Sequence, residues 1–162
     1  MPPCLIRPTQ PGDAGALAAS ECASQAAVGH RADLQRRLAF WREAIEFGEP
    51  LVQVACSGDQ VVGFVGYDRS RDPRTPPTMG EIWAIHLLAS HHGQGVGLAL
   101  WDVARDGLLE EGCTHVSVWV ELAQGRALRF LELAGFKRDM ASLRTVARGA
   151  ARVEEIRLKR ML

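Results

Sequence analysis

The organisation of this chain is decided by residues 80–97, which read GEIWAIHLLASHHGQGVG. The stretch from Gly80 to Leu88 is largely apolar and contains β-branched and aromatic side chains, which is typical of a buried strand. Three closely spaced glycines follow at positions 93, 95 and 97. From about Gly95 to Glu111, helical periodicity places an apolar set on one face: Val96, Leu100, Val103, Ala104 and Leu108. A strand, a glycine-rich turn and a helix are therefore predicted in that order.

The glycine-rich turn has the chemistry of an anion site. Closely spaced glycines let the backbone approach an anion and adopt conformations that other residues avoid. Successive backbone N–H groups then form a concave site for negative charge. The start of the following helix adds unpaired N–H donors and the positive end of the helix dipole. We therefore expect a phosphate or a pyrophosphate to bind at this turn.

Two familiar phosphate-binding motifs fit the turn poorly. A Walker P-loop ends in Gly-Lys-Ser/Thr, whereas Gly97 is followed by Leu98 and Ala99, which excludes that motif. A dinucleotide fingerprint GxGxxG that starts at position 93 or 95 needs glycine at position 98 or 100. Both positions are leucine, and the turn lies in mid-chain rather than after the first strand. A glycine-rich connection that binds no ligand remains as a third alternative.

The rest of the chain predicts a mixed sheet flanked by helices. Asp13 is expected to cap the first helix, the residues Leu34, Leu38, Trp41 and Ile45 form the stripe of the second, and Gly48 and Pro50 end it. The predicted elements are strands at 5–7, 51–56, 61–67, 80–88, 115–120, 143–146 and 153–158, and helices at 14–27, 34–47, 95–111 and 126–134. Residues 69–78 form a polar, proline-rich loop, either a lip over a cleft or a surface connection.

Composition narrows the class of protein. The 162 residues fit one domain, 1–162, and are 47% apolar and 23% charged, as in soluble globular proteins. Lys+Arg and Asp+Glu both number 19, so the net charge is zero, which argues against nucleic acid as a partner. The sequence contains no apolar run of the roughly 18 residues that a membrane helix needs, and no signal-peptide pattern at its start. A cytoplasmic protein without a membrane partner is predicted.

Cysteines and histidines give no sign of a metal site. Cys4, Cys22, Cys56 and Cys113 are far apart, form no CxxC pair, and are expected to be small buried side chains. His91 and His92 are adjacent, so their side chains should point apart, and a third ligand at metal-like spacing is missing. His30 and His115 are expected to have no special role.

Two motifs together resemble the GNAT superfamily of N-acetyltransferases. The central motif of that family is Gln/Arg-x-x-Gly-x-Gly/Ala, and residues 92–97 read HGQGVG. The second motif is Asn-x-x-Ala-x-x-Phe-Tyr-x-x-x-Gly-Phe, and residues 124–136 read QGRALRFLELAGF. The element order also matches along essentially the whole chain. The resemblance implies an α/β (α+β) fold with a mixed, mostly antiparallel central sheet, flanked by helices and containing a splayed central strand.

The resemblance also implies acetyl-CoA as cosubstrate, with no metal. The pyrophosphate would lie on the turn amides, from Gly93 to Leu98, and the pantetheine arm would pair with the backbone of the central strand. The implied cofactor-binding residues are Ile85, His86, Leu87, His92, Gly93, Gln94, Gly95, Val96, Gly97, Leu98 and Gln124. His92 replaces the usual Arg or Gln, and Gln124 replaces the usual Asn, from where it is expected to reach the pantetheine or cap the helix. Arg126 and Arg129 are expected on a solvated face.

The reaction implied by the resemblance is direct attack of an amine on the thioester in a ternary complex. A backbone N–H near Ile85 would stabilise the oxyanion. Glu81 stands where many family members carry a catalytic glutamate and is the predicted general base, the alternative being a strand-end glutamate that only forms a salt bridge or faces solvent. Leu131 replaces the tyrosine that usually protonates the thiolate. Solvent, His86 or the 69–78 loop would have to take over that step.

The acceptor is expected to be a primary amine of a small molecule or peptide. The acidic residues of the first two helices read as a solvated helical face rather than an acceptor site: Asp13, Glu21, Asp33, Glu43, Glu46 and Glu49. A homodimer is expected from the family, through the carboxyl-terminal strand at 153–158. Because Leu131 cannot donate a proton, the alternative function is a coenzyme A-binding or sensing module with little or no turnover.

Overall fold

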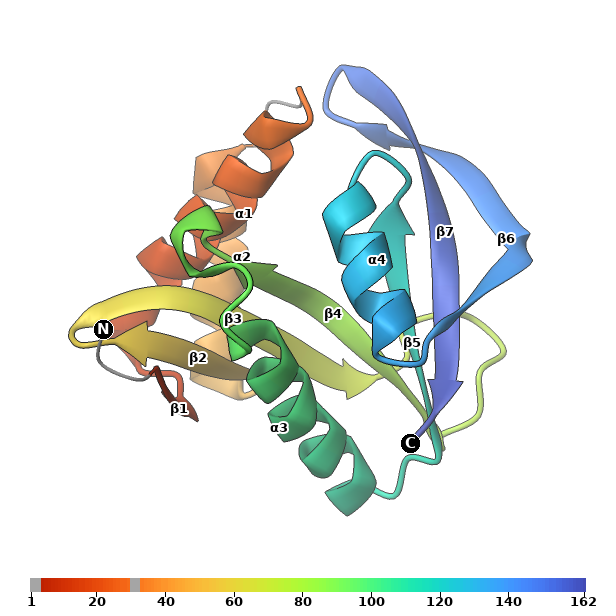
Figure 1. The fold of residues 1–162 in the computed structure, drawn as a ribbon, viewed down its shortest axis with the longest axis horizontal. Coiled ribbons are helices and arrows are strands. Elements are labelled where there is room, and N and C mark those ends of the chain that lie inside the picture. The colour runs from red at the N-terminus through yellow and green to blue at the C-terminus, as the bar shows by residue number, and fades with distance from the viewer. Residues whose placement is uncertain (1–3, 30–32) are drawn as a thin grey trace.

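The fold is known from a computed structural model, which describes residues 4–29 and 33–162 (Figure 1). The elements are β1 (Leu5–Pro8), α1 (Ala14–Ala27), α2 (Leu34–Phe47), β2 (Leu51–Ser57), β3 (Gln60–Arg69), β4 (Met79–Leu87), α3 (Val96–Glu110), β5 (His115–Glu121), α4 (Gly125–Leu133), β6 (Lys137–Arg148) and β7 (Ala151–Met161), with 3-10 turns at Pro11–Asp13 and Ala89–His91. His30 lies outside the described residues, so the structure does not test the prediction that this histidine has no special role.

The described strands form one seven-stranded sheet in the order β1-β2-β3-β4-β5-β7-β6. Every neighbouring pair is antiparallel except β4 and β5, which run parallel. This confirms the predicted mixed, mostly antiparallel sheet flanked by helices. The strand-turn-helix unit of residues 80–97 lies at its centre, since β4 is the fourth strand of the seven.

The sheet opens between β4 and β5. Their pairing runs from Met79 opposite His115 to Ile82 opposite Val118, while β4 continues to Leu87 and β5 to Glu121. Figure 1 shows the two strands side by side at one end and diverging toward α1 and α4. The divergence begins where Trp83 is an extra residue in the β3–β4 ladder, a bulge that bends β4. The predicted splayed central strand is confirmed.

Two apolar clusters hold helices to the two faces of the sheet. On one face, α3 and α4 pack on a cluster that includes Ile82, Leu100, Leu108 and Val118. On the other face, α1 and α2 pack through Leu17, Trp41 and Ala44 against Val54 and Phe64. The alternation of Phe64 and Val65 between the clusters is the period of two expected of a strand buried on both faces. The open end of β4 therefore lies between two layers of helices.

The predicted helix ends agree well with the structure, with one correction at Asp13. Gly48 ends α2 with φ 68°, a left-handed conformation that glycine adopts without strain. Asp13 precedes α1 but makes no side-chain cap to it. Its carboxylate instead accepts from the Gln10 backbone N–H at 2.7 Å and from Arg7 at 2.8 Å. Asp13 is thus the last residue of the 3-10 turn Pro11–Asp13, where its carboxylate binds the backbone N–H of Gln10 and links the turn to Arg7 of β1.

The two closing strands are longer than predicted. Residues 143–146 and 153–158 were expected to be strands, whereas β6 and β7 span 12 and 11 residues. The edge strand β6 has no fully buried residue, and its register shifts between Asp139 and Arg144. Because an exposed and interrupted edge strand has little apolar alternation, its sequence carries a weak strand signal. Backbone pairing with β7 determines its length.

Candidate functional site

The glycine-rich turn follows β4 and ends in the first turn of α3. Gly93 and Gly95 have φ values of 77° and 80°, in the region that favours glycine. Gly97 lies close to α4, since a Cβ there would be 3.3 Å from the Phe130 ring, a contact tighter than usual. The first N–H groups of a helix lack partners within the helix, which in α3 are those of Val96, Gly97 and Leu98. The turn thus presents a row of backbone donors.

Two side chains of the turn fold back onto the chain that precedes it. The Nε2 atom of His92 lies 3.0 Å from the Leu87 carbonyl oxygen, at the end of β4. The Gln94 side chain donates to the Ser90 carbonyl oxygen at 3.4 Å. Both contacts stabilise the path of the turn. The His92 ring is therefore committed to β4, and the backbone amides remain as the main donors of the turn.

A cleft of about 820 Å³, which we call the turn cleft, lies against the glycine-rich turn. Its walls come from β4, the turn, the start of α3, α4 and the second half of α1. Ten of the eleven predicted cofactor residues line it, namely Ile85, His86, Leu87, His92, Gly93, Gly95, Val96, Gly97, Leu98 and Gln124. Gln94 does not. Arg126 is exposed, as expected, but it also borders this cleft.

A second cleft of about 720 Å³, the loop cleft, meets the turn cleft. Its walls include α1, the start of α2, Arg71 of the 70–78 loop, β4, β5 and the turn between β6 and β7. The two clefts share six residues: Ser24, Ile85, His86, Gln124, Ala127 and Leu131. Five of the six lie on β4 (Ile85, His86) or on α4 and its N-cap (Gln124, Ala127, Leu131), so the clefts meet where β4 has separated from β5. The splay is a passage between the two clefts.

The junction of the clefts is closed by α4 and α1. The Gln124 side chain donates to the Ser24 carbonyl oxygen at 3.3 Å and makes no cap to α4, so the capping alternative for Gln124 is wrong. Leu131 is 1% exposed and offers no proton donor at the junction. Tyr67, the single tyrosine, lies elsewhere, with its ring against Gly107 of α3. The structure does not bring a tyrosine to the junction.

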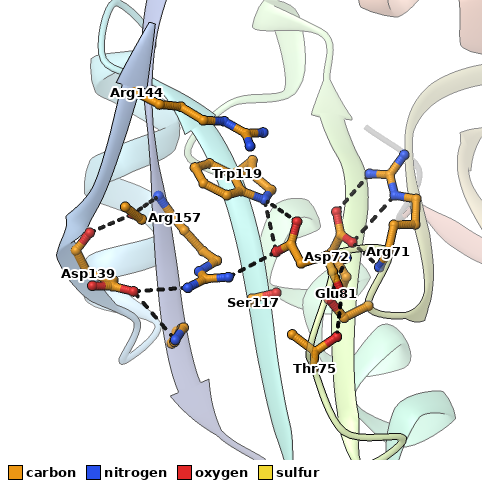
Figure 2. Close-up of polar contacts among 12 residues, drawn as sticks. Arg71, Asp72, Thr75, Glu81, Ser117, Trp119, Asp139, Arg144 and Arg157 are labelled. Atoms are coloured by element: carbon orange, nitrogen blue, oxygen red, sulfur yellow. Dashed lines mark hydrogen bonds and ion pairs between the residues drawn. The ribbon is translucent and has the colours of Figure 1, made fainter. Parts of the chain in front are cut away.

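Glu81 of β4 is held by Arg71 (Figure 2). Its side chain is almost fully buried, and it accepts from the Arg71 backbone N–H at 2.9 Å and from the guanidinium at 2.7 Å. The guanidinium also stacks over the Trp83 ring, 3.9 Å from its centroid. Arg71 and Trp83 line the loop cleft, whereas Glu81 is not among its lining residues.

The loop that carries Arg71 is fixed to the far half of the sheet (Figure 2). Asp72 accepts from Trp119 Nε1 of β5 at 3.0 Å and from Arg157 of β7 at 3.1 Å. Arg157 also binds Asp139 of β6 at 3.1 Å. Of the two alternatives for this loop, a cleft-lining segment agrees with the structure, since Arg71 forms part of the wall. No sequence pattern points to Asp72, because its partners Trp119 and Arg157 are distant in the chain.

His86 sits at the junction and faces a carboxylate of α1. Glu21 accepts from Arg37 Nε at 2.9 Å and Nη2 at 3.0 Å, and also from Trp41 Nε1. Its Oε2 atom lies 4.0 Å from His86 Nε2. The prediction of a solvated acidic face is therefore wrong for Glu21, whose side chain is 13% exposed. Burial lowers the pKa of His86; the Glu21 carboxylate opposes this shift and Arg37 adds to it.

Family comparison agrees with these features. A model of the acetyltransferase (GNAT) family matches residues 18–136, most of the chain. The chain belongs to the GNAT acetyltransferase family. The match spans α1 through Phe136, and so contains the glycine-rich turn, both walls of the splay and α4. The resemblance seen in the two sequence motifs is thereby confirmed.

Solved structures of the family share the fold over nearly the whole chain. The fold resembles yncA from Salmonella typhimurium, solved with its cofactor acetyl-CoA, at 18% identity and a TM-score of 0.74, covering 98% of this chain and 94% of that one. It resembles ribosomal-protein-alanine N-acetyltransferase from Brucella melitensis at 20% identity and a TM-score of 0.75, covering 98% and 99%. An N-acetyltransferase from Staphylococcus aureus gives 15% identity and a TM-score of 0.76, covering 98% of both. No curated protein matches the sequence.

Other features of the chain do not add a second site. In residues 4–29 and 33–162, His, Cys, Asp and Glu side chains do not gather in groups of three or more that would hold a metal ion. No helix in that part of the chain is both long and apolar enough to cross a membrane. All four cysteines are free, with Cys56 and Cys113 buried as expected and Cys4 and Cys22 half-buried.

Proposed function

We propose that this protein transfers an acetyl group from acetyl-CoA to a primary amine of a small molecule or a peptide, in a ternary complex. The observation that carries the proposal is the passage between β4 and β5. It joins a cleft lined by a row of backbone amides to a second cleft on the other side of the splay. Two substrates can thus approach one point from opposite sides, as direct transfer requires.

Acetyl-CoA is assigned to the turn cleft. Its pyrophosphate would accept from the amides between Gly93 and Leu98, at the positive end of the α3 dipole. The pantetheine arm would pair with the backbone of β4 from Ile85 to Leu87, which is past the last residue paired with β5. Support comes from the likeness to yncA, which was solved with acetyl-CoA. Arg126 borders the same cleft, and its guanidinium would be available to a further phosphate of the bound cofactor.

The amine is assigned to the loop cleft. Its lining carries four arginines (Arg36, Arg37, Arg71, Arg148) and four acidic residues (Glu21, Asp33, Glu121, Glu155), so neither charge dominates it. The name of the Brucella melitensis relative states an alanine amine of a ribosomal protein as its acceptor, which supports an amine in general. A backbone N–H near Ile85 would stabilise the oxyanion that forms when the amine attacks the thioester. The assignment of Glu81 as general base stays a prediction.

A second function is favoured by one observation, the buried Leu131 at the junction. A module that binds coenzyme A without turning it over would need no proton donor there. Such a module would bind acetyl-CoA as tightly as an enzyme does. The two functions differ in whether an amine accelerates the release of coenzyme A thiol.

The experiment measures binding and release separately. Purified protein is titrated with acetyl-CoA in a calorimeter, and thiol release is then followed with L-phenylalanine, tyramine, spermidine and a tetra-alanine peptide, against a control without amine. We expect saturable binding and release that depends on at least one amine. Binding without amine-dependent release would favour the binding module, and absence of binding would contradict both functions.

A further inference from the structure

His86 is the one titratable side chain among the six residues that the two clefts share. It lies on the part of β4 that pairs with β3 but not with β5, and its ring packs on Phe64 of β3, with the ring centroids 5.4 Å apart. The side chain is 21% exposed. The His86 ring is thus mostly buried, yet open to the point where the two substrates of the proposed reaction would meet.

Glu21 is held opposite His86 by contacts that fix its orientation. Arg37 binds both of its oxygens and Trp41 donates to one of them. The Oε2 atom lies 4.0 Å from His86 Nε2, within reach of an ion pair but longer than a hydrogen bond. The carboxylate therefore acts on His86 through its charge, in a site of low exposure where charges are weakly screened.

The charges around His86 come from several elements. Glu21 of α1 and Arg37 of α2 are the nearest, and β3 contributes the uncharged Phe64 ring. Further along the loop cleft are Asp33, Arg36, Arg71, Glu121, Arg148 and Glu155. Arg71 is paired with Glu81, and Arg148 with both Glu121 and Glu155. The near pair, Glu21 and Arg37, therefore dominates the field at the imidazole.

We propose that His86 is the catalytic base that takes the proton from the acceptor amine, and that the Glu21 carboxylate stabilises the imidazolium that then forms. This inference rests on the proposed function. A neutral imidazole accepts a proton, and burial keeps His86 neutral by lowering its pKa. Once the imidazolium forms, the Glu21 carboxylate stabilises it. The His86 imidazole is therefore unprotonated at neutral pH, and the imidazolium that forms during the reaction is stabilised by the negative charge of Glu21.

The step balances without an additional reactant. The acceptor enters as an ammonium ion and gives one proton to His86, which leaves a free lone pair on nitrogen. The nitrogen attacks the thioester carbonyl carbon, so that a C–N bond forms and the C–S bond breaks. The second proton lost by the nitrogen ends on the thiolate sulfur, giving the free thiol. His86 returns its proton to solvent through the loop cleft.

Glu81 is less suited to this step than His86. Arg71 occupies both of its oxygens, and the side chain is not among the residues that line either cleft. An acceptor amine in either cleft would therefore meet Arg71 and Trp83 of the wall before it met the Glu81 carboxylate. In this account Glu81 holds Arg71 in the wall of the loop cleft, which concerns acceptor binding rather than proton transfer.

The first test removes the base. His86→Gln and Glu81→Gln are compared with His115→Gln, a control at an exposed histidine outside both clefts. Thiol release is measured with acetyl-CoA and the most active amine of the four named above, and acetyl-CoA affinity is measured by calorimetry. We expect His86→Gln to lower kcat/KM about 100-fold or more, with affinity for acetyl-CoA retained. His115→Gln should match the wild type.

The second test is the pH profile of kcat/KM. If His86 had only a structural role, changing the charges around it would not move this profile. In the wild type, kcat/KM should fall at acidic pH, as His86 becomes protonated. Glu21→Gln removes the charge that raises the pKa of His86 and leaves Arg37, which lowers it, so the acidic limb should move to lower pH. Glu43→Gln, at an exposed position of α2, is the matched control and should not move it.

The outcomes separate this inference from the proposed function. A wild-type rate and pH profile in His86→Gln would overturn the inference alone, as would loss of the acidic limb in Glu81→Gln. If His86→Gln loses affinity for acetyl-CoA, turnover of His86→Ala is measured with and without added imidazole, which can replace the missing base. Recovery of turnover supports the inference, and failure to recover overturns it. Failure of the wild type to release thiol with any of the four amines contradicts the proposed function instead.

Discussion

At the scale of single residues, the turn after β4 depends on backbone conformation more than on side chains. Gly93 and Gly95 supply the positive φ values, while His92 and Gln94 direct their side chains back to residues 87 and 90. The glycine spacing was visible in the sequence because a positive φ has a residue preference. The junction of the two clefts could not be predicted in the same way. Glu21 and His86 meet because α1 packs on the sheet, and sequence spacing does not encode that packing.

The turn gives a prediction with a matched control. Gly95→Ala and Gly58→Ala both place alanine at a positive φ, and neither Cβ would meet another atom within 4 Å. Both variants should lose roughly 1–2 kcal/mol of unfolding free energy. Only Gly95→Ala should weaken acetyl-CoA binding in a calorimetric titration, because Gly58 lies in the β2–β3 turn. Equal affinities in the two variants would show that the turn does not hold the cofactor.

At the scale of elements, close packing of helices on the sheet determines where glycine is needed. A glycine in a helix usually costs about 1 kcal/mol relative to alanine. Gly107 in α3 is an exception, because a Cβ there would lie 2.5 Å from the Tyr67 ring, which is buried beneath the helix. Elements with strong periodicity, such as α2 and α3, were predicted to within a residue or two. The length of the edge strand β6 was not predicted, because it depends on backbone pairing with β7.

This packing predicts opposite signs for two alanine substitutions. Gly107→Ala should lower the melting temperature, since the cost of displacing a buried ring, about 1–3 kcal/mol, exceeds the gain in helix propensity. Gly15→Ala, in α1, meets nothing within 4 Å and should be stabilising by about 0.5 kcal/mol. Thermal unfolding followed by circular dichroism measures both. Stabilisation by Gly107→Ala would contradict the packing of α3 on β3.

At the scale of the whole molecule, the sheet consists of two parts that are paired over only four register positions of β4 and β5. Ionic contacts complement this short pairing, because the 70–78 loop binds β5 and β7 through Asp72, and Arg157 extends the contact to Asp139 of β6 (Figure 2). These contacts tie the loop that forms part of the loop-cleft wall to the strands on the far side of the splay. The sequence predicted the splay only through family resemblance, since charge pairs between distant strands leave no local pattern.

The network predicts a loss of stability in acid. Arg157 holds the pKa of Asp139 below its ordinary value, and Lys159 adds to the effect. A carboxylate with a lowered folded-state pKa stabilises the fold above its unfolded pKa of about 3.9, and this contribution disappears as pH falls. Asp139→Asn should therefore cost on the order of 1 kcal/mol at about pH 7 and less at about pH 3. Urea unfolding measures this.

The control for this prediction is Asp106→Asn, at an exposed position of α3. It should resemble the wild type at both pH values. A difference between Asp139→Asn and the wild type that stays constant as pH falls would show that the ion pair with Arg157 does not stabilise the fold.

The most direct test of the central claim is to identify the products of the reaction. The protein is incubated with acetyl-CoA and each of the four amines, and the acetylated amine is quantified by mass spectrometry alongside the free thiol. The account predicts one acetylated amine for each thiol released, with both lost in Gly95→Ala at limiting acetyl-CoA. Thiol release without an acetylated amine, or neither product with any of the four, would contradict it.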